Sequence, residues 1–241
     1  MKKALLALVL TLVLALFSLP ALAGDTLLVA SGAGYKTVVE ALATAYAHQS
    51  GTSVDRIYGN MGQIIGQAKT SGKVDLVIGE EGFLRSSDLP LAESTALGKG
   101  RLVVAWPTGK GEPTDLSASA VARIALPDPK RAIYGKAAAE YLENSGQRKT
   151  LENKLVIVGT VPQVFSYLAT GEVDAGFMNL TQAVAAADKI GGYREMDEKL
   201  YKPIVISCIR TENSPSPDAA RKFAEFLGTE TAQAIITAHG L

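Results

Sequence analysis

The order of apolar and polar residues along the chain predicts short strands that alternate with helices. Mostly apolar runs at 74–78, 102–106 and 204–209 are bounded by turn residues, as buried strands are. Over 37–49, apolar residues at 38, 39, 42, 43, 45 and 46 have helical spacing. Such an alternation is typical of an α/β fold whose mostly parallel sheets are buried on both faces.

The same reasoning assigns the remaining elements. Strands are expected at 26–30, 54–58, 74–78, 102–106, 122–126, 155–158, 175–178 and 204–209, and helices at 37–49, 63–70, 133–143, 162–169, 181–187, 218–227 and 231–238. Sheets of this kind bind ligands at the carboxyl ends of their strands, near helix N-termini. The turns that follow the strands are therefore the places to look for a site.

The first 23 residues have the three parts of a secretory signal peptide. Lys2 and Lys3 precede an apolar stretch at 4–17, and Ala21-Leu22-Ala23 forms an A-x-A cleavage pattern. The alternative is an uncleaved anchor, but this apolar stretch is shorter than the ~20 residues that span a bilayer. We expect 1–23 to be removed and the protein to be periplasmic.

Composition narrows the possible functions. The chain has 24 Lys+Arg and 24 Asp+Glu, so it lacks the excess positive charge that nucleic-acid binding requires. With 47% hydrophobic residues it can build a core, which argues against disorder. A single cysteine, Cys208, excludes an intramolecular disulfide and a multi-cysteine zinc site, and its apolar surroundings predict a buried core residue.

Motifs for catalysis and nucleotide binding are missing from the sequence. Gly32-Ala33-Gly34 begins like a dinucleotide loop, but Thr37 stands where the third glycine is needed. The sequence contains no G-x-S-x-G, S-x-x-K or H-E-x-x-H motif, and only two histidines. We therefore expect a protein that is not an enzyme and uses no cofactor or metal.

Two glycine-rich turns precede predicted helices and are candidates for anion binding. They are Ser31-Gly32-Ala33-Gly34 and Gly59-Asn60-Met61-Gly62. A helix N-terminus offers unpaired N–H groups and about half a positive charge, so an anion can bind there without lysine or arginine. The alternative is that both are ordinary turns in which Ser31 and Asn60 cap the helices.

Several strings, taken together and in order, resemble the solute-binding proteins of ABC importers, in particular the molybdate-binding type. The strings that show the resemblance are Leu27 to Gly34, Val74 to Ile78, Asp128-Pro129 with Gly135, Leu168 to Phe177, and the closing segment Ala219 to Leu241. The resemblance covers essentially the whole chain after the predicted signal peptide.

The resemblance implies the two-lobed periplasmic binding protein fold, in which each lobe is a mostly parallel sheet flanked by helices and two crossing strands join the lobes. Lobe one would comprise 24–104 plus 203–241, and lobe two 105–202. Such a protein captures a small oxyanion between its lobes and delivers it to an ABC permease in the inner membrane. We expect it to act as a monomer.

The resemblance also places the ligand contacts. The family's first-loop serine falls within Ser31 to Gly34, at Gly34 when no gap is allowed, and its second-loop serine falls at Met61. The predicted ligand-binding residues are Ser31, Gly32, Gly34, Asn60, Met61, Gly62, Tyr134, Val161 and Asn179.

Three departures from the family pattern leave the ligand open. Met61 has no side-chain donor, Asn179 replaces a tyrosine donor, and Glu80-Glu81 places two carboxylates near the expected cleft. The glutamates would repel a dianion, accept a proton from a protonated oxyanion, or pair with Lys36, Arg85 or Arg131. The leading hypothesis is a tetrahedral oxyanion of molybdate or tungstate type. The alternatives are phosphate, sulfate or an organic anion on the same fold, or a secreted hydrolase.

Overall fold

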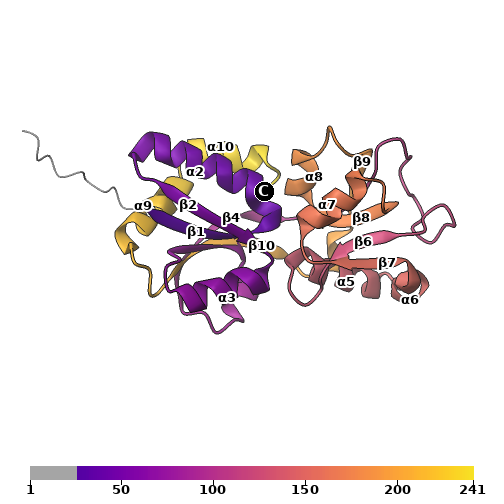
Figure 1. Ribbon diagram of the computed structural model, residues 1–241, viewed down its shortest axis with the longest axis horizontal. Coiled ribbons are helices and arrows are strands. Elements are labelled where there is room, and N and C mark those ends of the chain that lie inside the picture. Colours follow the sequence, from indigo (N-terminus) through magenta and orange to yellow (C-terminus); the bar gives the residue numbers. More distant parts are fainter. Residues whose placement is uncertain (1–25) are drawn as a thin grey trace, which may run out of the picture.

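The computed structural model of the protein describes residues 26–241, and the predicted signal peptide lies outside them. The described chain forms two lobes that lie side by side (Figure 1). Each lobe is built on a five-stranded sheet with helices on both faces. This architecture confirms the predicted two-lobed α/β fold.

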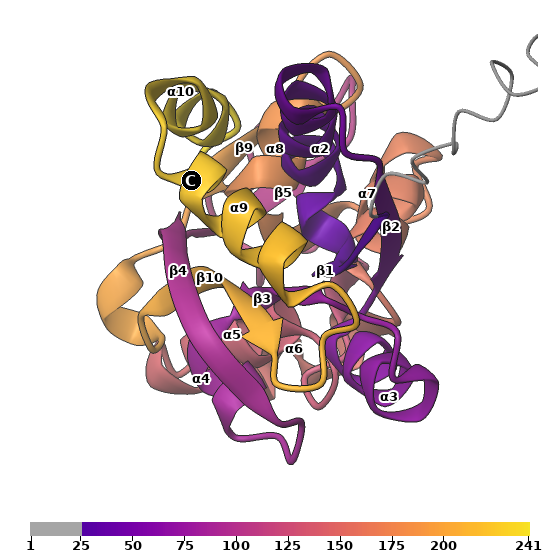
Figure 2. The same cartoon turned by 90° about the vertical axis from the view of Figure 1, so that its left-hand side faces the viewer.

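The first lobe contains both the beginning and the end of the described chain. Its strands, in the order β2-β1-β3-β10-β4, are β2 (Val54–Gly59), β1 (Leu27–Gly32), β3 (Leu76–Glu80), β10 (Ile204–Thr211) and β4 (Leu91–Gly100). Its helices are η1 (Ala33–Tyr35), α2 (Lys36–Ser50), α3 (Met61–Ser71), α4 (Glu81–Arg85), α9 (Pro217–Leu227) and α10 (Glu230–Ala238). Helices α2, α9 and α10 cover one face of the sheet, and α3 and α4 lie on the other (Figure 2).

The second lobe repeats this layered plan with the middle of the chain. Its strands, in the order β7-β6-β8-β5-β9, are β7 (Leu155–Val158), β6 (Ile124–Pro127), β8 (Ala175–Asn179), β5 (Leu102–Trp106) and β9 (Gly192–Glu195). Its helices are α5 (Ile133–Asn144), α6 (Arg148–Leu151), η2 (Glu152–Lys154), α7 (Val161–Ala169) and α8 (Leu180–Ala185), followed by η3 (Glu198–Leu200). Helices α7 and α8 lie on one face, and α5 and α6 on the other (Figure 1).

One strand in each sheet runs against the other four. Strand β10 is antiparallel to β3 and β4, and β5 is antiparallel to β8 and β9. Each of these strands begins just after the chain has crossed from the other lobe. The sheets are therefore mostly parallel, as predicted, although an apolar run does not reveal which strand is reversed.

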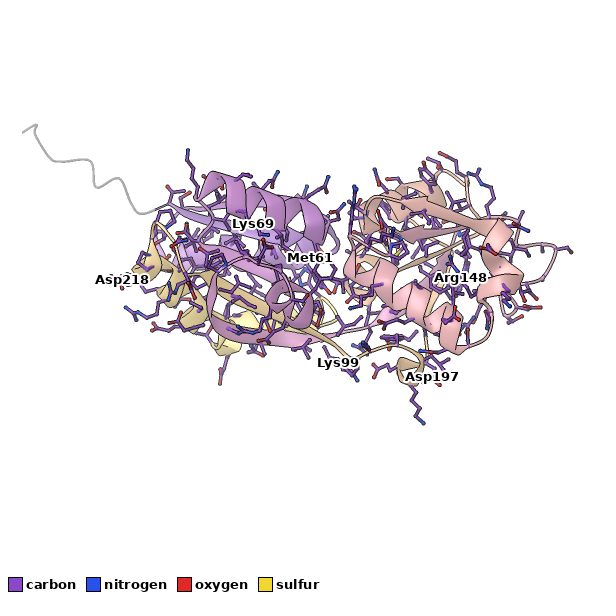
Figure 3. The ribbon with its side chains drawn as sticks, turned by 90° about the horizontal axis from the view of Figure 1, so that it is seen from below. Met61, Lys69, Lys99, Arg148, Asp197 and Asp218 are labelled. Carbon is purple, nitrogen blue, oxygen red and sulfur yellow. The ribbon has the colours of Figure 1, made fainter. Side chains whose placement is uncertain are left out.

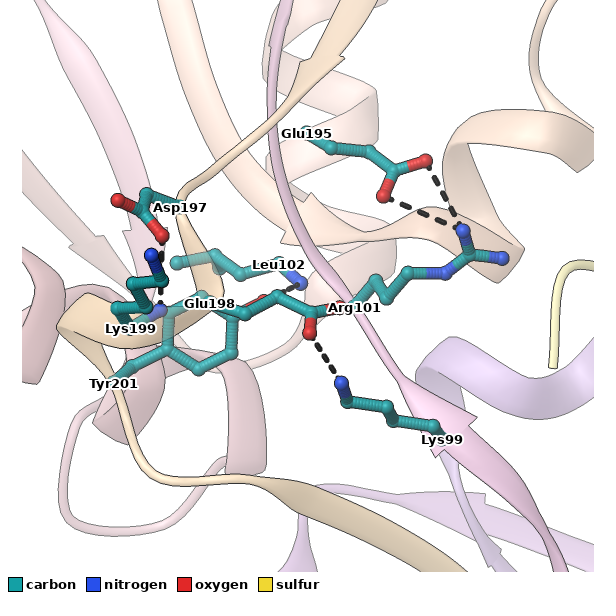
Figure 4. Close-up of polar contacts among 8 residues, drawn as sticks. All are labelled: Lys99, Arg101, Leu102, Glu195, Asp197, Glu198, Lys199 and Tyr201. Carbon is teal, nitrogen blue, oxygen red and sulfur yellow. Dashed lines mark hydrogen bonds and ion pairs between the residues drawn. The ribbon is translucent and has the colours of Figure 1, made fainter.

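The crossings are short and are linked by polar contacts (Figure 4). The first lies at Arg101, between β4 and β5, so all of β5 belongs to the second sheet, whereas the sequence led us to expect the boundary after residue 104. The second lies at residues 201–203, before β10. The Leu102 N–H donates to Tyr201 Oη at 3.1 Å, which ties one crossing to the other. Lys99 of β4 forms an ion pair with Glu198 of η3.

Among the strands and α-helices of the described chain, four have no counterpart among the predicted ones, and the three short 3-10 helices were not predicted either. The four are β4, β9, α4 and α6. Strands β4 and β9 lie at the edges of their sheets, and their largely half-exposed residues do not form the apolar run that marks a central strand. The single cysteine, Cys208, is buried as expected. It is 1% exposed on strand β10, and burial raises the pKa of its thiol to about 12.

Candidate functional site

A small cavity lies between the lobes where four helices begin. It has a volume of about 30 Å³. Helices η1 and α3 reach it from the first lobe, and α5 and α7 from the second. Figure 3 shows Met61, the first residue of α3, on the side of its lobe that faces the other lobe. The lining residues are Ala33, Gly34, Tyr35, Gly59, Asn60, Met61, Ala132, Ile133, Tyr134, Thr160 and Val161.

Two of the four helices begin with the same capping arrangement, one in each lobe. The Gln63 N–H donates to Asn60 Oδ1 at 2.9 Å, and the Asn60 N–H donates to Gln63 Oε1 at 2.9 Å. In α7, the Gln163 N–H donates to Thr160 Oγ1 and the Thr160 N–H to Gln163 Oε1. The two capping boxes satisfy the N–H groups of the cap residue and of the third helical residue.

The capping boxes leave one amide of each helix free. The amides of Met61 and Val161, each the first helical residue, have no hydrogen-bond partner within the described chain. Both residues line the cavity. The cavity is therefore supplied with main-chain donors from opposite lobes, and the partial positive charge of two helix N-termini favours an anion between them.

The cavity carries no formal charge of its own. Among its lining residues, all within the described chain, none is a lysine, arginine, aspartate or glutamate. The side-chain oxygens of Asn60 and Thr160 are already used as helix caps. The site therefore presents mainly hydrogen-bond donors, which suits a ligand that offers only acceptors.

Tyr35 and Tyr134 meet on one side of the cavity, one from each lobe. Their hydroxyl oxygens lie 2.6 Å apart, and both side chains are buried. Burial raises the pKa of both phenols above the ordinary value of 10.0, so both are neutral at pH 7. One hydroxyl donates to the other, and the hydroxyl that accepts keeps its own proton for a further bond.

Three more hydrogen bonds join the lobes around the cavity. Asn60 Nδ2 donates to the Gly159 carbonyl at 3.2 Å, and the Gly62 N–H donates to the Arg131 carbonyl at 3.3 Å. Asn179 Nδ2 donates to the Gly34 carbonyl at 2.8 Å. The structure therefore shows the lobes in contact around the cavity.

The nine residues predicted to bind the ligand divide into two groups. Gly34, Asn60, Met61, Tyr134 and Val161 line the cavity. Ser31, Gly32, Gly62 and Asn179 do not. The Ser31 hydroxyl is buried and bonds to the Gly32 carbonyl, while the Gly62 amide and the Asn179 side chain are used in the contacts between lobes.

Six lining residues were not among the nine predicted: Ala33 and Gly59, which lie within the two candidate turns, and Tyr35, Ala132, Ile133 and Thr160. Thr160 carried a readable signal, because Thr160 and Gln163 have the spacing of a capping box. Tyr35 carried none, since its position depends on contact with a residue 99 positions away.

The two glutamates are used within the first lobe. The Glu80 carboxylate caps α4, accepting the N–H groups of Gly82 and Phe83. The Glu81 carboxylate pairs with Arg85 and accepts from the Ser207 hydroxyl. Of the partners considered from the sequence, Arg85 is the one that Glu81 takes, and neither glutamate lines the cavity.

The fold and the site between the lobes define a two-lobed solute-binding protein, and comparisons with known proteins agree. Residues 27–241 match the bacterial extracellular solute-binding protein family. The chain is 29% identical over 238 residues to a molybdate-binding protein of Rhodobacter capsulatus, covering 92% of this chain and 90% of that one. It is 27% identical over 224 residues to a putative ABC transporter substrate-binding lipoprotein of Bacillus subtilis, covering 89% and 85%.

A solved structure shows the same likeness in three dimensions. The periplasmic molybdate-binding protein of Azotobacter vinelandii superposes with a TM-score of 0.81 at 26% identity, covering 89% of this chain and 97% of that one. This chain therefore belongs to the bacterial extracellular solute-binding protein family, as the resemblance in its sequence predicted. In the described chain, no helix is long and apolar enough to cross a membrane.

Proposed function

We propose that this protein is the exported solute-binding component of an ABC importer and captures a tetrahedral oxyanion of molybdate or tungstate type between its lobes. It acts in the periplasm without catalysis and delivers the anion to a permease in the inner membrane. The observation that supports this most strongly is the convergence of four helix starts, two from each lobe, on one small uncharged cavity. The names of the relatives from Rhodobacter capsulatus and Azotobacter vinelandii support the choice of molybdate.

The donor-rich lining favours a fully deprotonated anion. Hydrogen phosphate brings a proton that needs an acceptor. The Asn60 and Thr160 oxygens are already used as caps, and the Tyr35 and Tyr134 hydroxyls already bond to each other. An unpaired polar group in a closed site costs about 1–3 kcal/mol, so phosphate is disfavoured. Molybdate, tungstate and sulfate all lack that proton, so this argument does not separate them, and the choice of molybdate or tungstate over sulfate rests on the names of the relatives.

The cavity size also argues against a large organic solute. A volume of about 30 Å³ is far below that of typical sites for drug-sized ligands. Binding to both lobes at once favours the closed arrangement, because a ligand shifts a conformational equilibrium by its difference in affinity for the two states.

A thermal-shift screen tests the proposal. The purified protein is melted with molybdate, tungstate, sulfate and phosphate at equal ionic strength. Saturation at about a hundred times Kd adds about 2.7 kcal/mol of stability, so molybdate and tungstate should raise the melting temperature by several degrees. If none of the four anions changes it, the oxyanion proposal is wrong.

A further inference from the structure

We propose that the Asn179 side chain is a clasp that alternates between two partners as the lobes close and open. With the lobes together it bonds to Gly34 of lobe one, and with the lobes apart it caps helix α8 of its own lobe. Asn179 thus acts as a positioning residue for the proposed capture of a solute between the lobes, and the inference rests on that function.

The first observation is that the Asn179 amide reaches across to the other lobe. Asn179 ends β8 and is completely buried, and its Nδ2 donates to the Gly34 carbonyl at 2.8 Å. Because a carbonyl is only an acceptor, this bond also fixes which end of the amide faces Gly34.

The second observation is that the other end of the amide has no partner. Asn179 Oδ1 is buried and accepts no hydrogen bond within the described chain. A buried polar atom without a partner is rare and costs free energy, so this arrangement needs another interaction to offset it. The contact with Gly34 of lobe one is made in the closed arrangement, so the free-energy cost of the unpaired Oδ1 atom arises in that arrangement.

The third observation is that Asn179 already has the backbone of a helix cap. It is the N-cap residue of α8, with φ −85° and ψ 152°, yet its side chain makes no capping bond. Asparagine is among the best N-cap residues, and its side-chain oxygen normally accepts an N–H from the first helical turn. Rotation of the side chain alone would allow Oδ1 to cap α8 once Gly34 moves away.

Gly34 is suited to this exchange because it lacks a side chain. A Cβ on residue 34 would lie 2.7 Å from Asn179 Oδ1 and 3.2 Å from Cγ, too close for the closed contact to form. The contact between Asn179 and Gly34 also lies beside the first crossing, because the N–H of the next residue, Leu180, donates to the Arg101 carbonyl at 2.9 Å. On closing, the Asn179 side chain therefore gives up the cap of α8 and gains the bond to Gly34. Because one bond replaces another, the clasp does not strongly favour the closed state in the absence of solute.

The test measures the distance between the lobes in the absence of any anion. Spin labels are attached to Gln67→Cys on α3 and Lys149→Cys on α6, both exposed positions in different lobes. Cys208 is buried, so the labels attach to the introduced cysteines. Distance distributions are recorded by double electron–electron resonance at pH 8 for the otherwise unchanged protein and for Asn179→Ala, Asn179→Asp and Gly34→Ala.

Each substitution removes a different part of the clasp. Asn179→Asp keeps the capping oxygen and loses the donor, so the ratio of open to closed protein should rise about fivefold or more. Asn179→Ala loses both bonds and should shift the ratio less, while Gly34→Ala should open the lobes as Asn179→Asp does. Asn213→Asp, the same substitution at an exposed position, should leave the distribution unchanged.

Two results would overturn the proposal. If neither substitution at Asn179 changes the distance distribution, there is no clasp. If Asn179→Ala opens the lobes as much as Asn179→Asp, or more, the exchange with the α8 cap is wrong. Because no anion is present, these outcomes are independent of the anion screen, which tests the proposed function separately.

Discussion

The hydroxyl oxygens of Tyr35 and Tyr134 lie 2.6 Å apart, one from each lobe, beside the cavity at which four helices begin. The Tyr134 hydroxyl also lies so close to Gly100, the last residue of β4, that a Cβ there would overlap it. The tyrosine pair therefore lies between the cavity and the first crossing. Separation of the lobes at this point would break the contact between the two hydroxyls.

Removing both tyrosine hydroxyls should cost less stability than the sum of the costs of removing each one alone. Tyr35→Phe or Tyr134→Phe leaves a buried hydroxyl without its partner, and each should lower the free energy of unfolding by about 1–2 kcal/mol. The double substitution leaves no unpaired hydroxyl and should cost less than the sum of the two. Urea unfolding of the four proteins gives this coupling energy, with the half-buried Tyr167→Phe as the control. Strictly additive losses would show that the two hydroxyls are not coupled.

The tyrosine pair also predicts a loss of stability in alkaline solution. Burial raises the pKa of both phenols in the folded protein, while in the unfolded chain they titrate near 10.0. The folded state therefore holds these protons where the unfolded chain releases them, so the contribution is complete below about pH 10 and decreases as pH rises further.

This alkaline effect is measured as the free energy of unfolding at pH 8 to 11. The unsubstituted protein should lose more stability over this range than the Tyr35→Phe/Tyr134→Phe double variant. Equal losses would mean that the pair does not account for the change.

The free amide of Val161 should be essential for binding the anion. Proline is well tolerated as the first residue of a helix, and Thr160 before it already has the extended conformation that proline requires. Val161→Pro thus removes a donor that no protein group uses, and its ring also fills space near the cavity. Titration calorimetry should show at least a tenfold weaker affinity for molybdate, since hydrogen bonds to charged groups contribute about 1.5–3 kcal/mol. Val161→Ala, which keeps the N–H, should bind within a few-fold of the unsubstituted protein, and a similar loss in both variants would exclude the amide as the cause.

Asp75 should stabilise lobe one without taking part in binding. Its carboxylate is 1% exposed and accepts the Leu28 N–H at 2.8 Å, the Ser214 hydroxyl at 2.6 Å and the Ser216 N–H at 2.9 Å. Asp75→Ala leaves these donors unpaired and should lower the free energy of unfolding by at least about 2 kcal/mol. Exposed Asp55→Ala is the control, with an expected change within about 0.5 kcal/mol. Unchanged stability in Asp75→Ala would contradict this assignment.

The central strands and the long helices could be predicted from the sequence because burial imposes a readable pattern. The strand at 102–106 has the expected bounds, and α2 extends the expected helix by one residue at each end. The strand at 155–158 also has the expected bounds although β7 lies at the edge of its sheet, because its residues are apolar throughout. Edge strand β4 could not be predicted in this way, because most of its residues are at least partly exposed.

The site was less predictable because it depends on contacts between distant residues. The sequence marks the turns at Gly34 and Asn60, and it shows that helices follow them. It does not show that the Gly62 amide bonds to Arg131, whereas the Met61 amide stays free. That difference arises only when the lobes come together, which is also why Tyr35 was missed.

The most direct test of the account is the position of a bound anion. Crystals grown with tungstate are measured at a wavelength where tungsten scatters anomalously. We predict one strong anomalous peak between the lobes, within hydrogen-bond distance of the main-chain amides of Met61 and Val161. A peak elsewhere, or a closed cavity without tungsten at saturating concentration, would contradict the proposal that helix starts from both lobes bind the anion.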